Sequence, residues 1–163
     1  MKIQNLTTQV QYGENEESRV DELELMELAK AAAHKAYAPY SRFRVGVALK
    51  MADGTLFSGS NQENAAYPSG LCAERVTLFY ANAQKPNVAV DTLLIYAETD
   101  EGALEQPITP CGACRQVILE KEHLQGSPIT IILCGRDKMY RIRGIDNLMP
   151  LTFVGDVLPK VES

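Results

Sequence analysis

The sequence predicts an α/β fold in which helices pack on a five-stranded mixed sheet. The order of the segments carries this prediction, because helical and strand-like patterns follow one another as α-β-β-α-β-α-β-β. The composition agrees: 163 residues with 45% apolar and 23% charged side chains are ordinary for a soluble globular protein with a real core. Because there is no repeat, low-complexity stretch or linker, we expect one domain over residues 1–163.

The first helix is predicted from both of its ends. Ser18 followed by Asp21 resembles a capping box, which marks a helix start. Apolar residues then recur at helical spacing as far as about Ala36, and Pro39 ends the helix. Residues 1–12 alternate weakly, so the N-terminal part of residues 1–20 is expected to be an extended arm or an edge strand.

The remaining elements follow from apolar runs and from the turn residues between them. Asp53-Gly54 lies between two strand-like runs and indicates a β-hairpin. The last strand, MYRIRG, is expected to be edge-like. After the first helix the predicted segments are strands at 43–51 and 55–61, a helix at 72–83, a buried strand at 90–98, a helix at 111–123, and strands at 129–135 and 139–144.

The charge pattern disfavours a protein built to hold polyanions. Sixteen Lys and Arg against 21 Asp and Glu give a net charge of −5. Seven of the acidic residues fall within residues 14–27, where we expect a solvated helix face rather than a docking surface for a basic partner. A small basic cluster is expected on the outer face of a hairpin rather than on a nucleic-acid track, and consists of Arg136, Lys138, Arg141 and Arg143. We therefore expect no nucleic-acid polymer as a partner.

The sequence also predicts the compartment. No segment approaches the roughly 18 consecutive apolar residues of a membrane span, and MKIQNLTTQV lacks the apolar core of a secretory signal. We therefore expect a cytoplasmic protein without a membrane partner. In a reducing compartment, clustered cysteines more often bind a metal or take part in catalysis than form disulfides.

Three of the four cysteines fall at the predicted starts of two helices. Cys72 opens the run Cys-Ala-Glu-Arg, and Cys111 and Cys114 belong to Pro-Cys-Gly-Ala-Cys-Arg. Unpaired backbone amides and the positive end of the helix dipole stabilise thiolates there. Cys111 and Cys114 lie one helical turn apart and can bind one ion, to which Cys72 adds a third sulfur. Three ligands leave one tetrahedral position open, as catalytic zinc requires.

Two other interpretations of these cysteines compete with the catalytic one. A structural four-cysteine zinc site would need Cys134, which lies in the apolar run ITIILCG and is expected to be a small buried hydrophobe. A redox site at Cys111 and Cys114 would fit the C-x-x-C spacing, but leaves Cys72 and Glu74 unexplained.

Two charged residues beside Cys72 suit chemistry at such a metal. Glu74 can reach the open side of the ion without coordinating it, and can move protons between water and a leaving group. Arg75 can donate hydrogen bonds to sulfur and offset the charge of three thiolates. Arg115 could do the same, and a plain surface role fits it equally well.

Over roughly residues 25–155 the chain resembles the small zinc-dependent cytidine deaminases that act on free nucleosides. Zinc nucleobase deaminases carry an H-x-E and P-C-x-x-C pattern with a three-cysteine variant, and this chain has the three-cysteine form. The resemblance implies a three-layer α-β-α fold, one Zn²⁺ per chain and a homotetramer. The matching stretches are AYAPYSRFRVGVAL, NQENAAYPSGLCAER, PCGACRQVILE and LMPLTF.

The resemblance also implies roles for individual residues. Cys72, Cys111 and Cys114 match the zinc ligands, and Glu74 matches the proton shuttle. The implied substrate contacts are Asn61 and Glu63 for the ribose, in particular its 3′-hydroxyl, Phe43 and Phe153 for the base, and Ala65 and Tyr67 near a neighbouring subunit's site.

The expected activity is hydrolytic deamination of cytidine and 2′-deoxycytidine, with water as the second reactant, in pyrimidine salvage. A deaminase of a cytosine-bearing antibiotic such as blasticidin S shares the zinc half but lacks the NQEN residues. A non-enzymatic zinc module would need four tight ligands and no open position.

Overall fold

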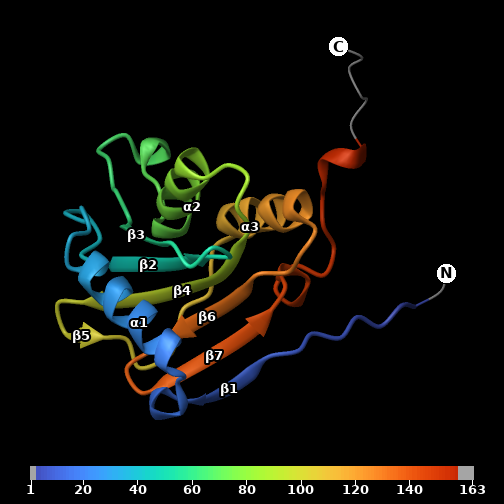
Figure 1. The fold of residues 1–163 in the computed structure, drawn as a ribbon. Coiled ribbons are helices and arrows are strands. Elements are labelled where there is room, and N and C mark those ends of the chain that lie inside the picture. The colour runs from blue at the N-terminus through green and yellow to red at the C-terminus, as the bar shows by residue number, and fades with distance from the viewer. Residues whose placement is uncertain (1–2, 158–163) are drawn as a thin grey trace.

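The computed structural model describes residues 3–157 and shows a mixed sheet between two layers of helices (Figure 1). Helix α1 covers one face, and α2 and α3 lie side by side on the other. This confirms the predicted three-layer arrangement. The strands are β1 (Gln11–Glu14), β2 (Arg44–Met51), β3 (Leu56–Ser60), β4 (Val90–Thr99), β5 (Gly102–Ala103), β6 (Thr130–Cys134) and β7 (Lys138–Arg143), and the helices are α1 (Val20–Ala33), α2 (Ala73–Gln84) and α3 (Gly112–Gln125).

Within residues 3–157 the sheet has seven strands, so the predicted number of five is wrong. The strands follow the order β1-β7-β6-β4-β2-β3, and β5 pairs with β4 beside this path. The pairing of β4 with β6 is parallel and the other pairings are antiparallel. The two extra strands are four and two residues long, too short to show a clear apolar alternation.

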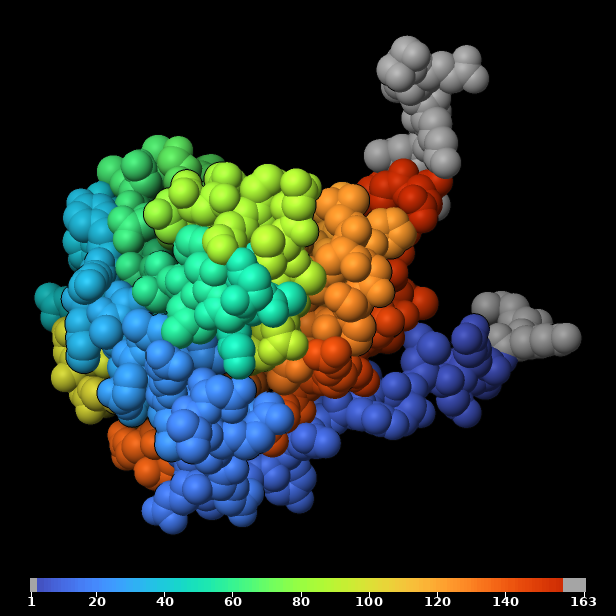
Figure 2. Space-filling model, viewed as in Figure 1, coloured from blue at the N-terminus to red at the C-terminus, as the bar shows by residue number. Residues whose placement is uncertain are grey.

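The last strand is not at the edge of the sheet. Strand β1 pairs antiparallel with β7 along its outer side, with Tyr12 opposite Tyr140. The edge position predicted for MYRIRG is therefore wrong, and the N-terminal arm, one of whose predicted forms was an edge strand, occupies that edge. The described residues ahead of β1, from residue 3 onwards, project from the body of the molecule (Figure 2).

Each face of the sheet has its own apolar core. On the side of α2 and α3, residues such as Leu93, Ile95 and Ile118 are buried, whereas Leu94 and Ile132 pack against α1 on the other side. Alternating residues of β4 thus enter opposite layers, as the pleat of a strand requires. Helix α1 lies so close to β2 that a Cβ atom at Gly46 would collide with the backbone of Ala29.

The start of α1 differs from the prediction. Arg19 rather than Ser18 is the N-cap, and the Glu22 carboxylate accepts a hydrogen bond from the Arg19 backbone N–H at 2.9 Å. The Ser18 hydroxyl instead contacts the sulfur of Met139 at 3.6 Å. The helix also ends at Ala33, earlier than predicted, before a turn that leads towards Pro39.

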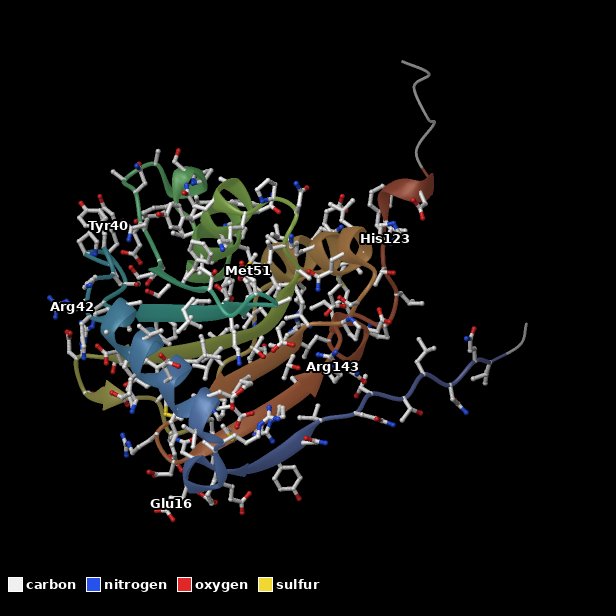
Figure 3. The ribbon with its side chains drawn as sticks, in the orientation of Figure 1. Glu16, Tyr40, Arg42, Met51, His123 and Arg143 are labelled. Atoms are coloured by element: carbon white, nitrogen blue, oxygen red, sulfur yellow. The ribbon has the colours of Figure 1, made fainter. Side chains whose placement is uncertain are left out.

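The charged clusters are less uniform than the sequence suggested. Three acidic residues of the N-terminal run, Glu14, Glu16 and Glu17, precede α1 in β1 and a short 3₁₀ turn, where Figure 3 labels Glu16. Glu22 is fully buried, so this part of the run is not a solvated face. The basic cluster lies on the predicted hairpin of β6 and β7, but Arg141 is turned to Glu22 rather than to solvent.

Among the described residues, none of the helices combines the length and apolar character that crossing a membrane demands.

Candidate metal centre and active site

Three cysteine sulfurs meet where α2 and α3 begin. Cys72 is the N-cap of α2 and Cys111 is the N-cap of α3, and both have extended backbones that lead into their helices. Cys114 follows in the first turn of α3 and is buried. Because α2 and α3 contact each other on one face of the sheet, their N-terminal ends bring the three side chains together.

The spacing of the sulfurs fits zinc. The three Sγ atoms lie within 4.8 Å of one another. The Cys72 and Cys111 sulfurs are 3.8 Å apart, and the Cys111 and Cys114 sulfurs are 3.4 Å apart. Tetrahedral zinc with Zn–S bonds of about 2.3 Å places its sulfurs about 3.8 Å apart. The donor set is therefore of the right kind and close to the right geometry for one zinc ion with a fourth position open.

The thiols differ in their acidity. Burial raises the pKa of Cys114 and the pKa of Cys72. Burial also disfavours the Cys111 thiolate, but hydrogen bonds from the Cys114 backbone and from neighbouring groups outweigh it and lower the pKa of Cys111. Because a metal binds the thiolate form, zinc binding must release protons from Cys72 and Cys114.

The fourth cysteine lies on the other side of the sheet. Cys134 is buried at the end of β6 in the apolar cluster beneath α1, and burial raises its pKa to about 12. This confirms the expectation of a small buried hydrophobe. A four-cysteine structural site is therefore not formed.

Glu74 and Arg75 lie in the first turn of α2, next to the sulfurs. The side chain of Glu74 is 4% exposed, and burial raises its pKa against opposing hydrogen bonds from its own backbone and from Cys114. Arg75 donates from Nη2 to the Cys72 sulfur at 3.8 Å, as expected of a residue that offsets thiolate charge.

Arg115 does not take the sulfur-bonding role that the sequence left open. Its guanidinium donates to the carbonyl oxygens of Pro110 and Leu148, at 2.8 and 2.7 Å, and to the hydroxyl of Thr109. It thus joins the loop before Cys111 to the C-terminal segment.

An open pocket of about 480 Å³ reaches Cys72 from the adjoining loops. Three predicted substrate contacts, Asn61, Glu63 and Tyr67, line it together with this cysteine. The volume lies within the usual range for a site that takes a small ligand. The other lining residues are Tyr40, Ser41, Gln62, Asn64, Gly70 and Leu71.

Three other predicted contacts do not line this pocket. Phe43 is half-buried against the core, and Ala65 is exposed outside the lining. Phe153 is 57% exposed on the C-terminal segment, where its carbonyl accepts a hydrogen bond from Gln116 of α3. The single chain therefore brings three of the six predicted substrate contacts to the pocket beside Cys72. The two phenylalanines and Ala65 lie outside it.

Asn61 has a further task in the structure. Its side-chain oxygen accepts a hydrogen bond from the Val45 backbone at 2.8 Å, and its amide nitrogen donates to the Phe43 carbonyl at 2.9 Å. The residue thus braces the start of β2 beside the pocket.

Sequence reasoning gave no role to Ser41, which also lines the pocket. Its hydroxyl accepts a hydrogen bond from the backbone of Phe43 two residues later, at 3.0 Å. Such a turn is common for serine and could have drawn attention to this position.

The comparisons with known proteins agree with this site. The family model for the cytidine and deoxycytidylate deaminase zinc-binding region matches residues 19–124, a range that contains all three clustered cysteines. Together with the sulfur geometry, this match identifies one zinc ion per chain as the cofactor.

Named relatives cover much of the chain. A cytidine deaminase of Halalkalibacterium halodurans is 44% identical over 103 residues, which are 62% of this chain and 72% of that protein. One from Mycobacterium tuberculosis is 38% identical over 133 residues, 81% of this chain and 89% of the relative. The crystal structure of a Burkholderia pseudomallei cytidine deaminase has a TM-score of 0.67 and 40% identity, and covers 80% of this chain and 98% of its own. The chain therefore belongs to the zinc-dependent cytidine deaminase family.

Proposed function

We propose that this protein hydrolyses cytidine and 2′-deoxycytidine to uridine and 2′-deoxyuridine with release of ammonia. The observation that carries the proposal is the group of three sulfurs beside buried Glu74, at the end of a pocket lined by Asn61 and Glu63. Three sulfurs rather than four favour a catalytic zinc over a structural one.

The proposed chemistry assigns proton transfer to Glu74. Zinc, held by Cys72, Cys111 and Cys114, supplies Lewis-acid activation of water when it is bound. The Glu74 carboxylate takes a proton from the attacking water and passes it to N3 of the base while the water oxygen bonds to C4. Glu74 then takes the proton of the new C4 hydroxyl and delivers it to the exocyclic amino group. The C4–N bond breaks, ammonia leaves, and the C4 oxygen becomes the carbonyl of the uracil base. Arg75 stabilises the Cys72 thiolate through its hydrogen bond.

The proposed substrate contacts divide by position. Asn61 and Glu63 bind the sugar, with Glu63 accepting a hydrogen bond from the 3′-hydroxyl, and Phe43 lies towards the base. Ala65 and Tyr67 act near a neighbouring subunit's site, and Tyr67 is 76% exposed. Phe153 contacts the base, and because it lies outside the pocket of its own chain, we propose that it does so in the site of a neighbouring subunit.

We also propose a homotetramer with sites shared between subunits. Large apolar side chains are exposed around the pocket mouth, on α2 and on the C-terminal segment, a pattern that favours association. They include Tyr40, Tyr67, Phe79, Tyr80, Leu151 and Phe153. We further propose that the protein is a single domain that acts on free nucleosides in pyrimidine salvage. It does so in the cytoplasm, without a nucleic-acid or membrane partner.

Metal analysis combined with a cytidine absorbance assay tests this function. We expect about one zinc per chain, loss of cytidine absorbance with protein, and loss of the activity after chelation and its return with added zinc. Zinc near one per chain without any change in cytidine would contradict the enzyme and favour a zinc module. Activity on blasticidin S but not on cytidine would instead favour the antibiotic deaminase.

A further inference from the structure

The loop between α1 and β2 forms one wall of the pocket and contains a strained residue. Tyr40 and Arg42, both labelled in Figure 3, belong to this loop. Arg42 has a φ of +57°, in the left-handed region that residues with a side chain rarely adopt. Such a backbone is unfavourable for a residue with a Cβ atom and persists where surrounding contacts fix it.

The contacts that fix this loop converge on Glu63. Its Oε2 atom accepts hydrogen bonds from the backbone N–H groups of Tyr40 and Ser41, at 2.9 and 3.3 Å. Its Oε1 atom accepts a hydrogen bond from the Ser41 hydroxyl. Glu63 therefore holds the loop, and the loop in turn fixes the carboxylate.

The direction of the Ser41 hydrogen bond is determined by its neighbours. The Phe43 backbone N–H donates to Ser41 Oγ at 3.0 Å, which uses a lone pair of the hydroxyl. An ionised carboxylate can only accept, so the Ser41 proton must point to Glu63. The hydrogen bond from Ser41 is the leading cause that lowers the pKa of Glu63, which keeps the group ionised.

These contacts limit what Glu63 can still bind. A carboxylate offers about four lone-pair sites, two on each oxygen. The two backbone donors occupy Oε2, and Ser41 occupies one site on Oε1. One acceptor site on Oε1 is left for a substrate hydroxyl.

We propose that Ser41 is a positioning residue that sets the specificity of the site, because it orients Glu63 so that one acceptor remains for one sugar hydroxyl. The inference rests on the proposed function, in which Glu63 accepts a hydrogen bond from the 3′-hydroxyl of the substrate. Ser41 thereby influences sugar discrimination through the position of Glu63. Ser41 is exposed, so its substitution does not disturb a core.

A pair of substrates isolates this effect from general damage to the loop. 2′-Deoxycytidine and 2′,3′-dideoxycytidine differ only in the 3′-hydroxyl. The ratio of their kcat/KM values therefore measures how much the 3′-hydroxyl contributes to substrate recognition. We expect Ser41→Ala to lower kcat/KM for 2′-deoxycytidine about tenfold, mostly through KM, the scale of one hydrogen bond to a charged group. For the dideoxy substrate we expect a loss of about twofold or less.

Two further variants serve as controls. Ser41→Thr keeps the hydroxyl and is expected to keep the wild-type ratio. Ser58→Ala removes an exposed hydroxyl from β3, outside the pocket, and is expected to change neither substrate. Thermal unfolding midpoints close to that of the wild type verify that all three variants fold.

The outcomes separate this inference from the function on which it rests. Equal losses on both substrates, or no loss on either, would overturn the role of Ser41 while leaving cytidine deamination intact. If Ser41→Thr lowered the ratio of the two kcat/KM values as much as Ser41→Ala, the effect would come from the shape of the loop. That result would also overturn the role of the Ser41 hydroxyl. A folded, zinc-loaded wild type that deaminates neither substrate would overturn the proposed function together with this inference.

Discussion

The carboxylate of Glu22 in α1 accepts two hydrogen bonds from the Arg141 guanidinium in β7, at 2.9 and 2.6 Å. The side chain of Glu22 is 1% exposed, whereas that of Arg141 is 26% exposed. Arg19 adds a third ionic contact to the same carboxylate at 2.9 Å. The Glu22–Arg141 ion pair joins α1 to β7. The same Glu22 carboxylate also caps α1, because it accepts the hydrogen bond from the Arg19 backbone N–H.

Glu22→Gln is expected to destabilise the fold by about 3 kcal/mol, because breaking a buried ion pair leaves the remaining charge without its partner. Urea unfolding of the variant and the wild type measures this difference. Glu24→Gln, at an exposed position of the same helix, is the matched control and is expected to change the free energy of unfolding by less than about 0.5 kcal/mol. Similar losses in both variants would contradict the importance of the Glu22–Arg141 pair.

The same pair predicts a pH dependence of stability. Burial opposes ionisation of Glu22, but hydrogen bonds from Arg141 and Arg19 outweigh it and lower the pKa of Glu22 below 4.5 in the folded protein. A lowered folded-state pKa means that the stabilisation is complete above the unfolded pKa and is lost as the pH falls through the folded pKa. We expect the stability difference between wild type and Glu22→Gln to shrink as the pH is lowered from 6 to about 3. A difference that stays constant over this range would contradict the prediction.

The cysteines provide a matched test of the metal site. Cys114→Ala removes one of the three clustered sulfurs, whereas Cys134→Ala removes a buried sulfur from the opposite face of the sheet. We expect Cys114→Ala to lose zinc and activity, and Cys134→Ala to keep about one zinc per chain with only a modest loss of stability. Metal analysis of the two purified variants distinguishes them, and zinc loss in Cys134→Ala would show that the ligand set is wrong.

The hydrogen bonds of Arg115 predict that this side chain fixes the C-terminal segment to the loop before α3. Its hydrogen bond to the Leu148 carbonyl lies just before the stretch that carries Phe153, so Arg115→Met should release that stretch. The expected result is faster proteolysis within residues 148–156 and a loss of about 1–3 kcal/mol in the free energy of unfolding. Arg136→Met, which removes a single hydrogen bond to Ala103 elsewhere on the surface, should leave that stretch protected.

The metal site could be predicted from the sequence because its parts are local. Cys111 and Cys114 are one helical turn apart, and both Cys72 and Cys111 stand at helix starts that their flanking residues mark. The main helices and the longer strands were predictable for the same reason, since each carries its own apolar periodicity.

The remaining features depend on residues that are distant in sequence. Strand β1 is four residues long and gains its structure by pairing with β7 at the other end of the chain. Glu22 is separated from Arg141 by 119 positions, and Ser41 from Glu63 by 22. No local pattern specifies such pairs, so neither the Glu22–Arg141 ion pair nor the brace around Glu63 could be predicted.

Glu74→Gln tests the central claim most directly, because it alters the proton shuttle while leaving the three sulfurs in place. Zinc content and cytidine deamination are measured on the same preparation of the variant and of the wild type. We expect about one zinc per chain in both proteins, and a rate for the variant that is about 10²–10⁴-fold lower, the usual contribution of general acid–base catalysis. A zinc-loaded Glu74→Gln protein that deaminates cytidine at the wild-type rate would contradict the claim.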